Sequence, residues 1–534
     1  MALSDIAGES AKGSFALILG NALSAILSAI AVILIARLLG PSAYGVYSLA
    51  FVIPSIFVSL ADFGISPALT RFTASLRAEQ KTHKAASMIT SAILFTILAS
   101  AAAFAVAYGT AGPLASIVLH RTDIGFLVAA ASTLILFQGL WSLSYYGLVG
   151  LDKMDRSATM TVLRDLVKMA LCPVLIIAGY GILGAAAGQI AAWAFPGFLG
   201  VYLLFQSRRK LSNAGEALTI NAFKEDIRTM TRFGIPLYLG SLFGTMFNQY
   251  QTIVLAFFTS NAEIGNFEAA LSFGTLISIV AAPVTLAIFP AFSKLDLRTR
   301  TQDLQTMFEH SVTYMTLLIV PVAVLVATLS GDLTRVLFGN AYTSAPILLS
   351  LYAAVYLFTA IGYQANTAFL AGVGKTKDSL KVAVAQTASF LPLAPLMTWL
   401  FHAPGLLFAL LLSTFMSTTF GLFLVHRYGM KVNLKASAGA LIASLIAALP
   451  IMPIVHLSPL PRIVNVLLAA IIYLPVYITL APLCGALEFA DIEVLGAILT
   501  KVRGLRPFVS VVLAHENRVL RLRGRLGKSS RPVP

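Results

Sequence analysis

Charged residues are scarce in this sequence. They make up 11% of the 534 residues, whereas soluble globular proteins contain roughly 25%. The mean hydropathy is +0.87, and apolar runs of about 20 residues, the length at which a helix crosses a bilayer, recur along the chain. This composition excludes an ordinary soluble domain and predicts a membrane-embedded protein. The first run begins near Ser14 and is too long for a signal-peptide core, so we interpret it as a retained span.

Cysteines and long outer loops are also few. Cys172 and Cys484 fall in separate apolar runs, and two isolated cysteines cannot form a disulfide framework. No His/Cys cluster has the spacing of metal ligands, and no group of residues has the pattern of a catalytic centre. The connections on one side of the expected spans are too short to hold an active site. We therefore predict a protein that is not an enzyme and carries no cofactor or metal.

The sequence contains many long apolar runs. They predict an all-α polytopic membrane protein with about fourteen transmembrane helices, each long enough to cross a hydrocarbon core of roughly 30 Å. The expected helices lie at 14–36, 46–70, 86–108, 124–149, 160–178, 183–205, 233–259, 265–290, 307–329, 344–370, 380–400, 404–427, 434–456 and 462–482.

The basic residues support an even number of spans. Of the 37 Lys and Arg residues, 33 fall at the N-terminus, in the loops after even-numbered spans or in the C-terminal tail. The other side has only Arg37, Arg121, Arg335 and Arg462. Because Lys and Arg accumulate on the cytoplasmic side of membrane proteins, we expect both termini in the cytoplasm.

The net charge of +15 does not indicate a nucleic-acid partner. The charges form short clusters between apolar runs, which is a topology pattern. The basic segment "RVLRLRGRLGKSSR" (518–531) is typical of a tail that binds anionic lipid headgroups. The stretch "GVGKT" (372–376) is not a phosphate-binding loop, because Phe369 stands where that motif needs glycine. We predict membrane lipids as partners and no nucleic acid.

An internal repeat organises the chain. "LGPSAYGVYSLAF" (39–51) aligns with "FTSNAEIGNFEAAL" (258–271), which matches Gly45 to Gly265. "GLVGLDKMD" (147–155) aligns with "FLAGVGKTKD" (369–378), which matches Lys153 to Lys375. Each half has an even number of spans, so the repeats are parallel, an arrangement that often places a substrate pathway between two halves. The predicted domains are an N-terminal six-helix lobe (1–206), a cytoplasmic linker (207–232), a C-terminal six-helix lobe (233–428), an extra helix pair (429–485) and a basic cytoplasmic tail (486–534).

The stretch "ARLLGPSAYGVYSLAFVIPSIFVSLADFGISPALTRF" (36–72) resembles the polysaccharide transporter family, the O-antigen-type flippases of the multidrug/oligosaccharidyl-lipid/polysaccharide exporter superfamily. Similarity continues through "GLVGLDKMDR", "LAGVGKTKDS" and "EFADIEVLGAIL" (488–499). The resemblance implies two six-helix lobes around a central cavity and alternating access. It also implies flipping of a lipid-linked oligosaccharide, carried on polyprenyl diphosphate, across the cytoplasmic (inner) membrane for surface polysaccharides such as lipopolysaccharide or exopolysaccharide. A polymerase and a chain-length regulator are expected partners, and a monomer is expected because each chain has its own cavity.

Other functions stay open from the sequence. A multidrug or cation antiporter and a lipid II flippase belong to the same superfamily and share the architecture. A membrane glycosyltransferase or polysaccharide polymerase is a more distant alternative, which the short outer loops and the internal repeat disfavour.

Asp62 and Glu268 are two of the carboxylates that fall within the expected spans. Asp62 lies nine residues before Arg71, roughly 13 Å from the cytoplasmic interface at 1.5 Å per residue. A charged Asp near the membrane centre costs about 2.5–3.5 kcal/mol. We therefore consider Asp62, and Glu268 in the repeat-mate span, as sites for a coupling proton or sodium ion. The structural alternatives are a hydrogen bond to a neighbouring helix for Asp62 and an interfacial, hydrated carboxylate for Glu268.

Further polar residues are candidate contacts for the substrate of such a transporter. Arginine can bind two phosphate oxygens at once, and the candidate diphosphate contacts are Arg37, Arg71, Arg232 and Lys168. The candidate contacts for sugar hydroxyls are Asn21, Gln138, Tyr145, Asn248 and Gln249. Each also has a structural interpretation, as a topology anchor, a helix–helix hydrogen bond or an interfacial aromatic, and Lys168 could snorkel or pair with Asp165.

Overall fold

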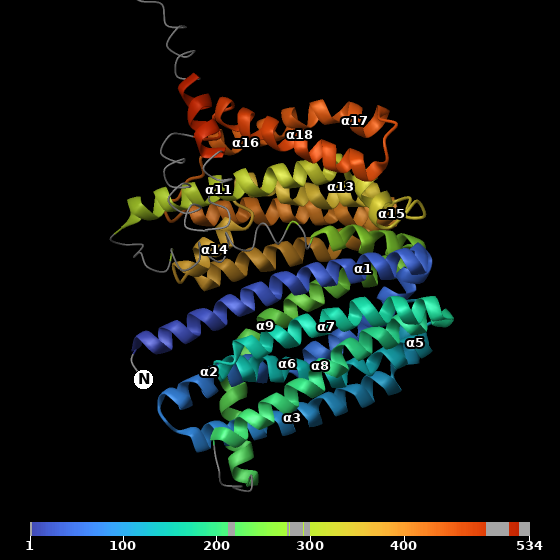
Figure 1. Cartoon of the computed structure of the whole chain (residues 1–534), viewed down its shortest axis with the longest axis vertical. Helices are drawn as coiled ribbons and strands as arrows, with labels where there is room; N and C mark the ends of the chain where they lie inside the picture. Colours follow the sequence, from blue (N-terminus) through green and yellow to red (C-terminus); the bar gives the residue numbers. More distant parts are fainter. Residues whose placement is uncertain are drawn as a thin grey trace, which may run out of the picture. The chain divides into compact units, whose positions relative to one another are not determined.

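The structure is a computed structural model, and it describes residues 3–211, 219–274, 277, 292, 300–487 and 512–522. Every regular element within these ranges is a helix (Figure 1), which confirms the predicted all-α class. The first elements are α1 (Leu3–Ala61), α2 (Ile65–Ala78), α3 (Thr82–Gly109), α4 (Ala111–Ile117), α5 (Gly125–Ser132), α6 (Leu134–Gly150), α7 (Met154–Leu175), the π-helix η1 (Ile176–Tyr180), α8 (Gly181–Leu211), α9 (Ile220–Phe258) and a helical segment at 261–274. The later ones are α11 (Thr301–Thr328), α12 (Ser330–Leu337), α13 (Ala345–Val355), the 3₁₀-helix η2 (Tyr356–Ile361), α14 (Ala365–Gly372), α15 (Thr376–His426), α16 (Leu434–Ala448), the 3₁₀-helix η3 (Leu449–Ile451), α17 (Met452–Leu457), α18 (Arg462–Leu483) and a helical segment at 512–522.

Several expected spans are joined into longer helices by a kink. Gly40 (φ 74°) separates the two halves of α1, and His402 (φ 56°) separates the two halves of α15. Each half corresponds to one expected span. The expected span 344–370 corresponds to α13, η2 and α14, a helix pair bent by 49°.

The described chain has eight helical stretches long and apolar enough to cross a membrane, or nine if the bent pair is one span. This confirms a multi-pass membrane protein. Three of the stretches hold two expected spans each, namely Gly13–Ala78, Met154–Arg209 and Thr376–His426. The expected span 265–290 lies mostly outside the described residues, so the number fourteen stays a prediction.

Packing divides the chain into two units, Met1–Ala269 and Ala270–Pro534. In the first unit α7 packs against α1 and α8, and α9 packs against α1, α2 and α3. The buried core that joins α2, α3, α6 and α8 contains Ile65, Leu69, Ile89, Leu143 and Leu204. The packing boundary, between Ala269 and Ala270, comes after the end of α9. The repeat predicts a boundary at 207–232, so the predicted domains stay a prediction.

In the second unit α11 packs against α13 and α16, and α16 packs against α18 (Figure 1). The buried surface of the α16–α18 pair includes the small residues Ala440, Ala443 and Ala469, which let membrane helices approach closely. The Tyr477 hydroxyl donates to the Leu317 carbonyl over 3.0 Å. This hydrogen bond attaches the C-terminal helix pair to α11.

The turn between α6 and α7 and the turn between α14 and α15 share one hydrogen-bond pattern. The Lys153 amide donates to the Leu148 carbonyl over 2.9 Å, and the Lys375 amide donates to the Leu370 carbonyl over 2.8 Å. The residue before each lysine has a left-handed backbone, with φ of 56° and 77°. Both turns are therefore Schellman endings, and the two aligned lysines occupy the same position in them.

The aligned glycines lie at one helix crossing inside the first unit. A Cβ atom on Gly45 would lie 1.9 Å from the Asn261 carbonyl oxygen, and one on Gly265 would lie 1.9 Å from the Pro41 carbonyl oxygen. These contacts are reciprocal, because the same sequence offset relates Pro41 to Asn261 and Gly45 to Gly265. The helices touch backbone to backbone, so only glycine fits at either position.

The helical segment at 512–522 docks on the end of α18. The Thr479 hydroxyl lies 2.9 Å from Nε2 of His515. Val519 and Leu520 are 6% and 5% exposed. The predicted basic tail thus contains a helix that packs on the second unit through an apolar face.

Glu516 is expected to make this docking depend on pH. The residue is 8% exposed, and burial raises the pKa of its carboxyl from 4.5 to about 7. Between pH 4.5 and about 7 the Glu516 carboxyl is protonated in the docked helix and ionised in the undocked helix. Docking therefore takes up a proton and weakens as the pH rises through about 7. We expect the protection of 512–522 in hydrogen exchange, corrected for the intrinsic rate, to fall about tenfold between pH 6 and pH 8. The Glu516→Gln variant should show no such fall, and equal protection of the wild type at both pH values would contradict the prediction.

Candidate functional site

Asp62 lies at a break between two helices. The helix α1 ends at Ala61, and α2 begins at Ile65. The Asp62 carboxylate accepts hydrogen bonds from the Gly64 amide (3.2 Å) and from the Ser66 hydroxyl. The sequence predicts an unbroken helix here, with a bend at Pro67. The structure instead ends the helix before Asp62, because Gly64 adopts φ 76° and cannot continue it.

A neighbouring helix packs closely on this break. A Cβ atom on Gly64 would lie 2.4 Å from the carbonyl of Gly234 on α9, so the two glycines allow backbone contact. The ring of Phe63 stacks on Tyr238, with centroids 6.0 Å apart. Asp62 is half-buried as a result. Its position suits both a structural role in the break and a carboxylate site within the membrane.

Two substitutions separate these roles. We expect Asp62→Ala to destabilise the fold by about 1–3 kcal/mol, because the Gly64 amide and the Ser66 hydroxyl lose their acceptor. Asp62→Asn keeps an acceptor oxygen and should retain the wild-type melting temperature. If the carboxylate binds a coupling ion, transport is lost in both variants. Wild-type transport by Asp62→Asn would leave Asp62 with a structural role alone.

A buried ion pair joins four helices of the first unit. The Arg164 guanidinium on α7 donates twice to the Asp165 carboxylate, over 2.8 and 3.1 Å. The Asp165 side chain is 3% exposed, and it also accepts a hydrogen bond from the Ser24 hydroxyl on α1. The guanidinium lies 5.1 Å from the ring of Trp141 on α6 and 4.9 Å from the ring of Trp193 on α8. We call these five residues the arginine cage.

The arginine cage satisfies the charge of Arg164 internally. A guanidinium that is bound bidentately and covered by two indoles has strong cation–π and ionic partners, so it is poorly placed to bind a diphosphate. Two predicted substrate residues lie beside it. Tyr145 stacks on Trp141, with centroids 5.3 Å apart. Lys168 lies one turn beyond Arg164 and interacts electrostatically with Asp165, although the direct ion pair of Asp165 is with Arg164.

The remaining candidates are dispersed over the first unit. The Arg71 guanidinium lies 4.1 Å from the ring of Phe233, a cation–π contact that ties α2 to α9. The Thr252 hydroxyl donates to Glu268 over 3.0 Å. The exposed candidates are Asn21, Arg37, Arg232 and Asn248, and the half-buried ones are Gln138 and Gln249. The structure thus gathers only Tyr145 and Lys168 at one cluster.

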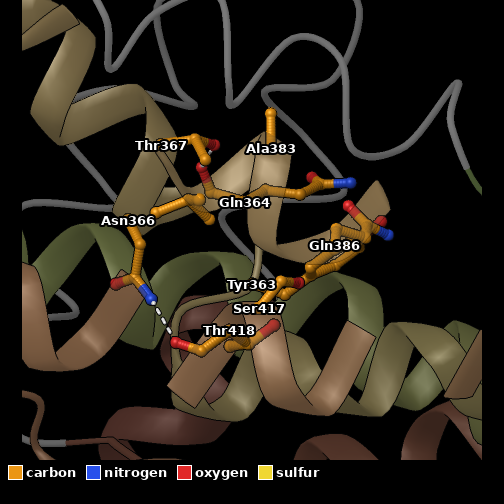
Figure 2. Close-up of a pocket in the computed structure, with 9 residues that line it drawn as sticks. Tyr363, Gln364, Asn366, Thr367, Ala383, Gln386, Ser417 and Thr418 are labelled. Atoms are coloured by element: carbon orange, nitrogen blue, oxygen red, sulfur yellow. Dashed lines mark hydrogen bonds between the residues drawn. The ribbon is translucent and has the colours of Figure 1, made fainter. Parts of the chain in front are cut away.

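The second unit contains a polar pocket that the sequence analysis missed. It has a volume of about 190 Å³ and lies between the η2–α14 region and α15. Figure 2 shows the amides of Gln364 and Gln386 on one side of it and Asn366 turned toward Thr418. The polar side chains that line it include Tyr363, Gln364, Asn366, Gln386, Ser417 and Thr418.

The broken helix positions this polar lining. Gly362 adopts φ 90° between η2 and α14, so the following residues leave the axis of α13. A Cβ atom at Gly362 would lie 2.6 Å from Oδ1 of Asn366, and the position therefore requires glycine twice over. The sequence signal was three amides within the expected spans 344–370 and 380–400. Gln364 and Asn366 are two residues apart, whereas Gln386 follows Asn366 by 20 residues, and only the fold brings the three together.

No group of three or more His, Cys, Asp or Glu residues could hold a metal ion in the part of the chain that the structure describes. The pocket offers neutral oxygen and nitrogen atoms, and the arginine cage offers a neutralised ion pair. The pocket can bind and orient a polar ligand, whereas the charges of the arginine cage are engaged by its own residues.

Comparison with known proteins agrees with a transport role. The polysaccharide biosynthesis protein family matches residues 10–296. The lipid II flippase MurJ of Bacillus subtilis is 20% identical over 82% of this chain and 87% of its own length. A probable low-salt glycan biosynthesis flippase of Haloferax volcanii is 21% identical over 27% of this chain, and a probable flippase of the same organism is 23% identical over 38%. The chain spans only 30% and 40% of the length of these two relatives.

Solved structures share the fold. A lipid II flippase MurJ in an inward closed conformation superposes with a TM-score of 0.68 at 15% identity, over 86% of this chain and 97% of that one. An inward-facing multidrug resistance transporter of the MATE family and MOP superfamily superposes with a TM-score of 0.60 at 15% identity, over 77% of this chain and 98% of that one. The relatives are named as flippases and transporters, in agreement with the prediction that the chain is not an enzyme.

Proposed function

This chain belongs to the polysaccharide biosynthesis protein family, and from that premise we propose that it flips a lipid-linked oligosaccharide across the cytoplasmic membrane. The carrier in this proposal is polyprenyl diphosphate, and the product enters a surface polysaccharide such as lipopolysaccharide or exopolysaccharide. The observation that carries the proposal is the family match over residues 10–296. The transporter fold supports it, since that fold is the kind of scaffold such a step needs.

The physical task is to avoid dehydration of the sugar. Hydroxyls and a diphosphate lose their hydration in hydrocarbon at a cost of several kcal/mol per polar group. Alternating access would offer a polar route for the head group while the lipid tail stays in the bilayer. Arg37 and Arg232 are exposed on their helices and are our proposed contacts for the diphosphate. No covalent step is required.

Coupling and topology complete the proposal. Asp62 and Glu268 are the proposed sites for a coupling proton or sodium ion. We place both termini in the cytoplasm, because 33 of the 37 basic residues fall on that side of the expected topology. We expect a monomer that delivers its product to a polymerase and a chain-length regulator.

The test is the sidedness of lipid-linked sugars in cells depleted of this protein. Lipids are extracted after an impermeant sugar-modifying enzyme has treated the outer face of the membrane. We expect one oligosaccharide-lipid to accumulate in the protected, cytoplasmic pool and to return to normal on complementation with the wild-type chain. Accumulation of lipid II instead would assign the chain to peptidoglycan synthesis. Unchanged pools would refute a flippase role and turn attention to drug and cation antiport.

A further inference from the structure

The polar pocket of the second unit lies within the expected spans 344–370, 380–400 and 404–427. Ser417 is ten residues before Arg427, which follows the end of α15, and Gln386 is five residues after Lys381 on α15. At 1.5 Å per residue these separations are roughly 8–15 Å, about a quarter to a half of a 30 Å hydrocarbon core. A cavity lined by amides and hydroxyls at this depth is costly unless a ligand or water occupies it.

Several oxygen atoms of the lining have no partner. Asn366 is 1% exposed and donates from Nδ2 to the Thr418 carbonyl over 3.2 Å, but its Oδ1 accepts nothing. Oε1 of Gln364 and Oγ1 of Thr418 are buried and unpartnered as well. Buried polar atoms are almost always hydrogen-bonded. Three buried polar atoms of pocket residues thus lack a hydrogen-bond partner, so the fold alone does not satisfy the polar groups around this cavity.

The chemistry of the lining limits what this occupant can be. Among the residues that the structure describes, those lining the pocket include no Asp, Glu, Lys, Arg or His, so this lining offers a diphosphate no countercharge. The volume of about 190 Å³ holds about six water molecules at roughly 30 Å³ each. That is the size of one monosaccharide ring and much larger than a single dehydrated ion.

The fixed groups of the pocket suit sugar hydroxyls, which both donate and accept hydrogen bonds. The Gln386 amide is held in place by a hydrogen bond that it donates to the Thr414 hydroxyl over 3.3 Å. A small number of positioned polar groups in a concave site is the usual design of a small-molecule site.

We propose that this pocket is a subsite for one uncharged sugar ring of the transported oligosaccharide. The proposal rests on the flippase function proposed above. Gln364, Asn366 and Thr418 accept hydrogen bonds from the sugar hydroxyls, and the ring of Tyr363 forms part of the wall. The subsite belongs to the second unit alone, so it selects by sugar structure and does not contact the diphosphate.

The test is saturation-transfer NMR with the purified full-length chain in detergent. The probes are the oligosaccharide and the monosaccharides released by mild acid from the lipid-linked pool of the same cells. We expect saturation transfer to at least one of these sugars, and about tenfold weaker apparent binding to Thr418→Val, which loses one buried hydrogen bond. The variant should keep the wild-type melting temperature, because the side-chain oxygen it removes has no partner in the fold.

A matched control lies one turn beyond Gln386 in the first half of α15. The Ser389 hydroxyl bonds to carbonyls of its own helix and is not part of the pocket, so Ser389→Ala should bind sugar as the wild type does. Equal loss of sugar binding in Thr418→Val and Ser389→Ala would overturn the proposal. Absence of saturation transfer to the wild type, while the sidedness assay shows flipping, would overturn the subsite and leave the flippase function standing. Stabilisation by sodium chloride but not choline chloride, lost in Thr418→Val, would identify a cation site instead.

If depletion of this protein leaves all lipid-linked pools unchanged, the sidedness assay refutes the flippase function. The probes are then the same sugars prepared from wild-type cells. Sugar binding that is sensitive to Thr418→Val would still identify the pocket as a sugar site. The two proposals therefore have separate outcomes.

Discussion

Replacing Asp165 by alanine is expected to destabilise the first unit by about 3 kcal/mol, the lower end for a buried ion pair, because it leaves the Arg164 guanidinium, whose side chain is 21% exposed, without its counterion. Arg164 directs two hydrogen bonds to this carboxylate and is enclosed by Trp141 and Trp193. The cost of the unpaired charge is larger inside the membrane than at a water-exposed surface. The measurement is the melting temperature of the purified protein in detergent, followed by light scattering or fluorescence.

A double substitution provides the control for this prediction. Removing both charges, as in Arg164→Gln with Asp165→Asn, replaces the ion pair by two neutral amides and should recover most of the lost stability. If Asp165→Ala melts at the wild-type temperature, the ion pair contributes nothing. If the double variant is as unstable as the single one, the shape of the arginine cage matters more than its charge.

Gly45→Ala is expected to destabilise the first unit by about 1–3 kcal/mol through overpacking at the helix crossing. The added methyl group would lie 1.9 Å from the Asn261 carbonyl oxygen, so the helices must move apart. Gly265→Ala should cost a similar amount, because its contact with Pro41 is the reciprocal one. Melting temperatures and elution profiles in detergent measure both effects.

The control is a glycine in an open position on α9. A Cβ atom at Gly244 would meet no atom of the described residues within 4 Å, and alanine favours a helix over glycine by about 1 kcal/mol. Gly244→Ala should therefore be neutral or stabilising. If the Gly45→Ala variant, like the Gly244→Ala variant, melts at or above the wild-type temperature, the crossing tolerates a side chain.

Much of the fold could be predicted because membrane helices are encoded locally. A run of about 20 apolar residues is sufficient to specify a span, and the described helices follow these runs. The repeat could be predicted as far as its turns, since Lys153 and Lys375 occupy equivalent positions in matching Schellman endings. The family resemblance in residues 36–72 agrees with the family match over 10–296.

The sites could be predicted less well, because they depend on distant residues and on helix breaks. Asp62 was expected inside a continuous helix, since nothing in an apolar run marks where Gly64 will adopt a left-handed backbone. The arginine cage joins Trp141 and Trp193, which are 52 residues apart, and no sequence pattern specifies that contact. The residues that line the pocket on its η2–α14 side reach it because the chain bends at Gly362.

The arginine cage also has a consequence for how the protein is made. Arg164, Asp165 and Lys168 occupy the middle of α7, and each charge adds about 2.5–3.5 kcal/mol to the insertion of a lone helix. Two of the residues that contact these charged side chains, Ser24 and Trp141, lie on helices that are synthesised before α7. The ribosome therefore synthesises α7 after two of these partners and before Trp193 on α8. The helix α7 enters the bilayer as part of a growing bundle, and its insertion is tied to the helices that precede it.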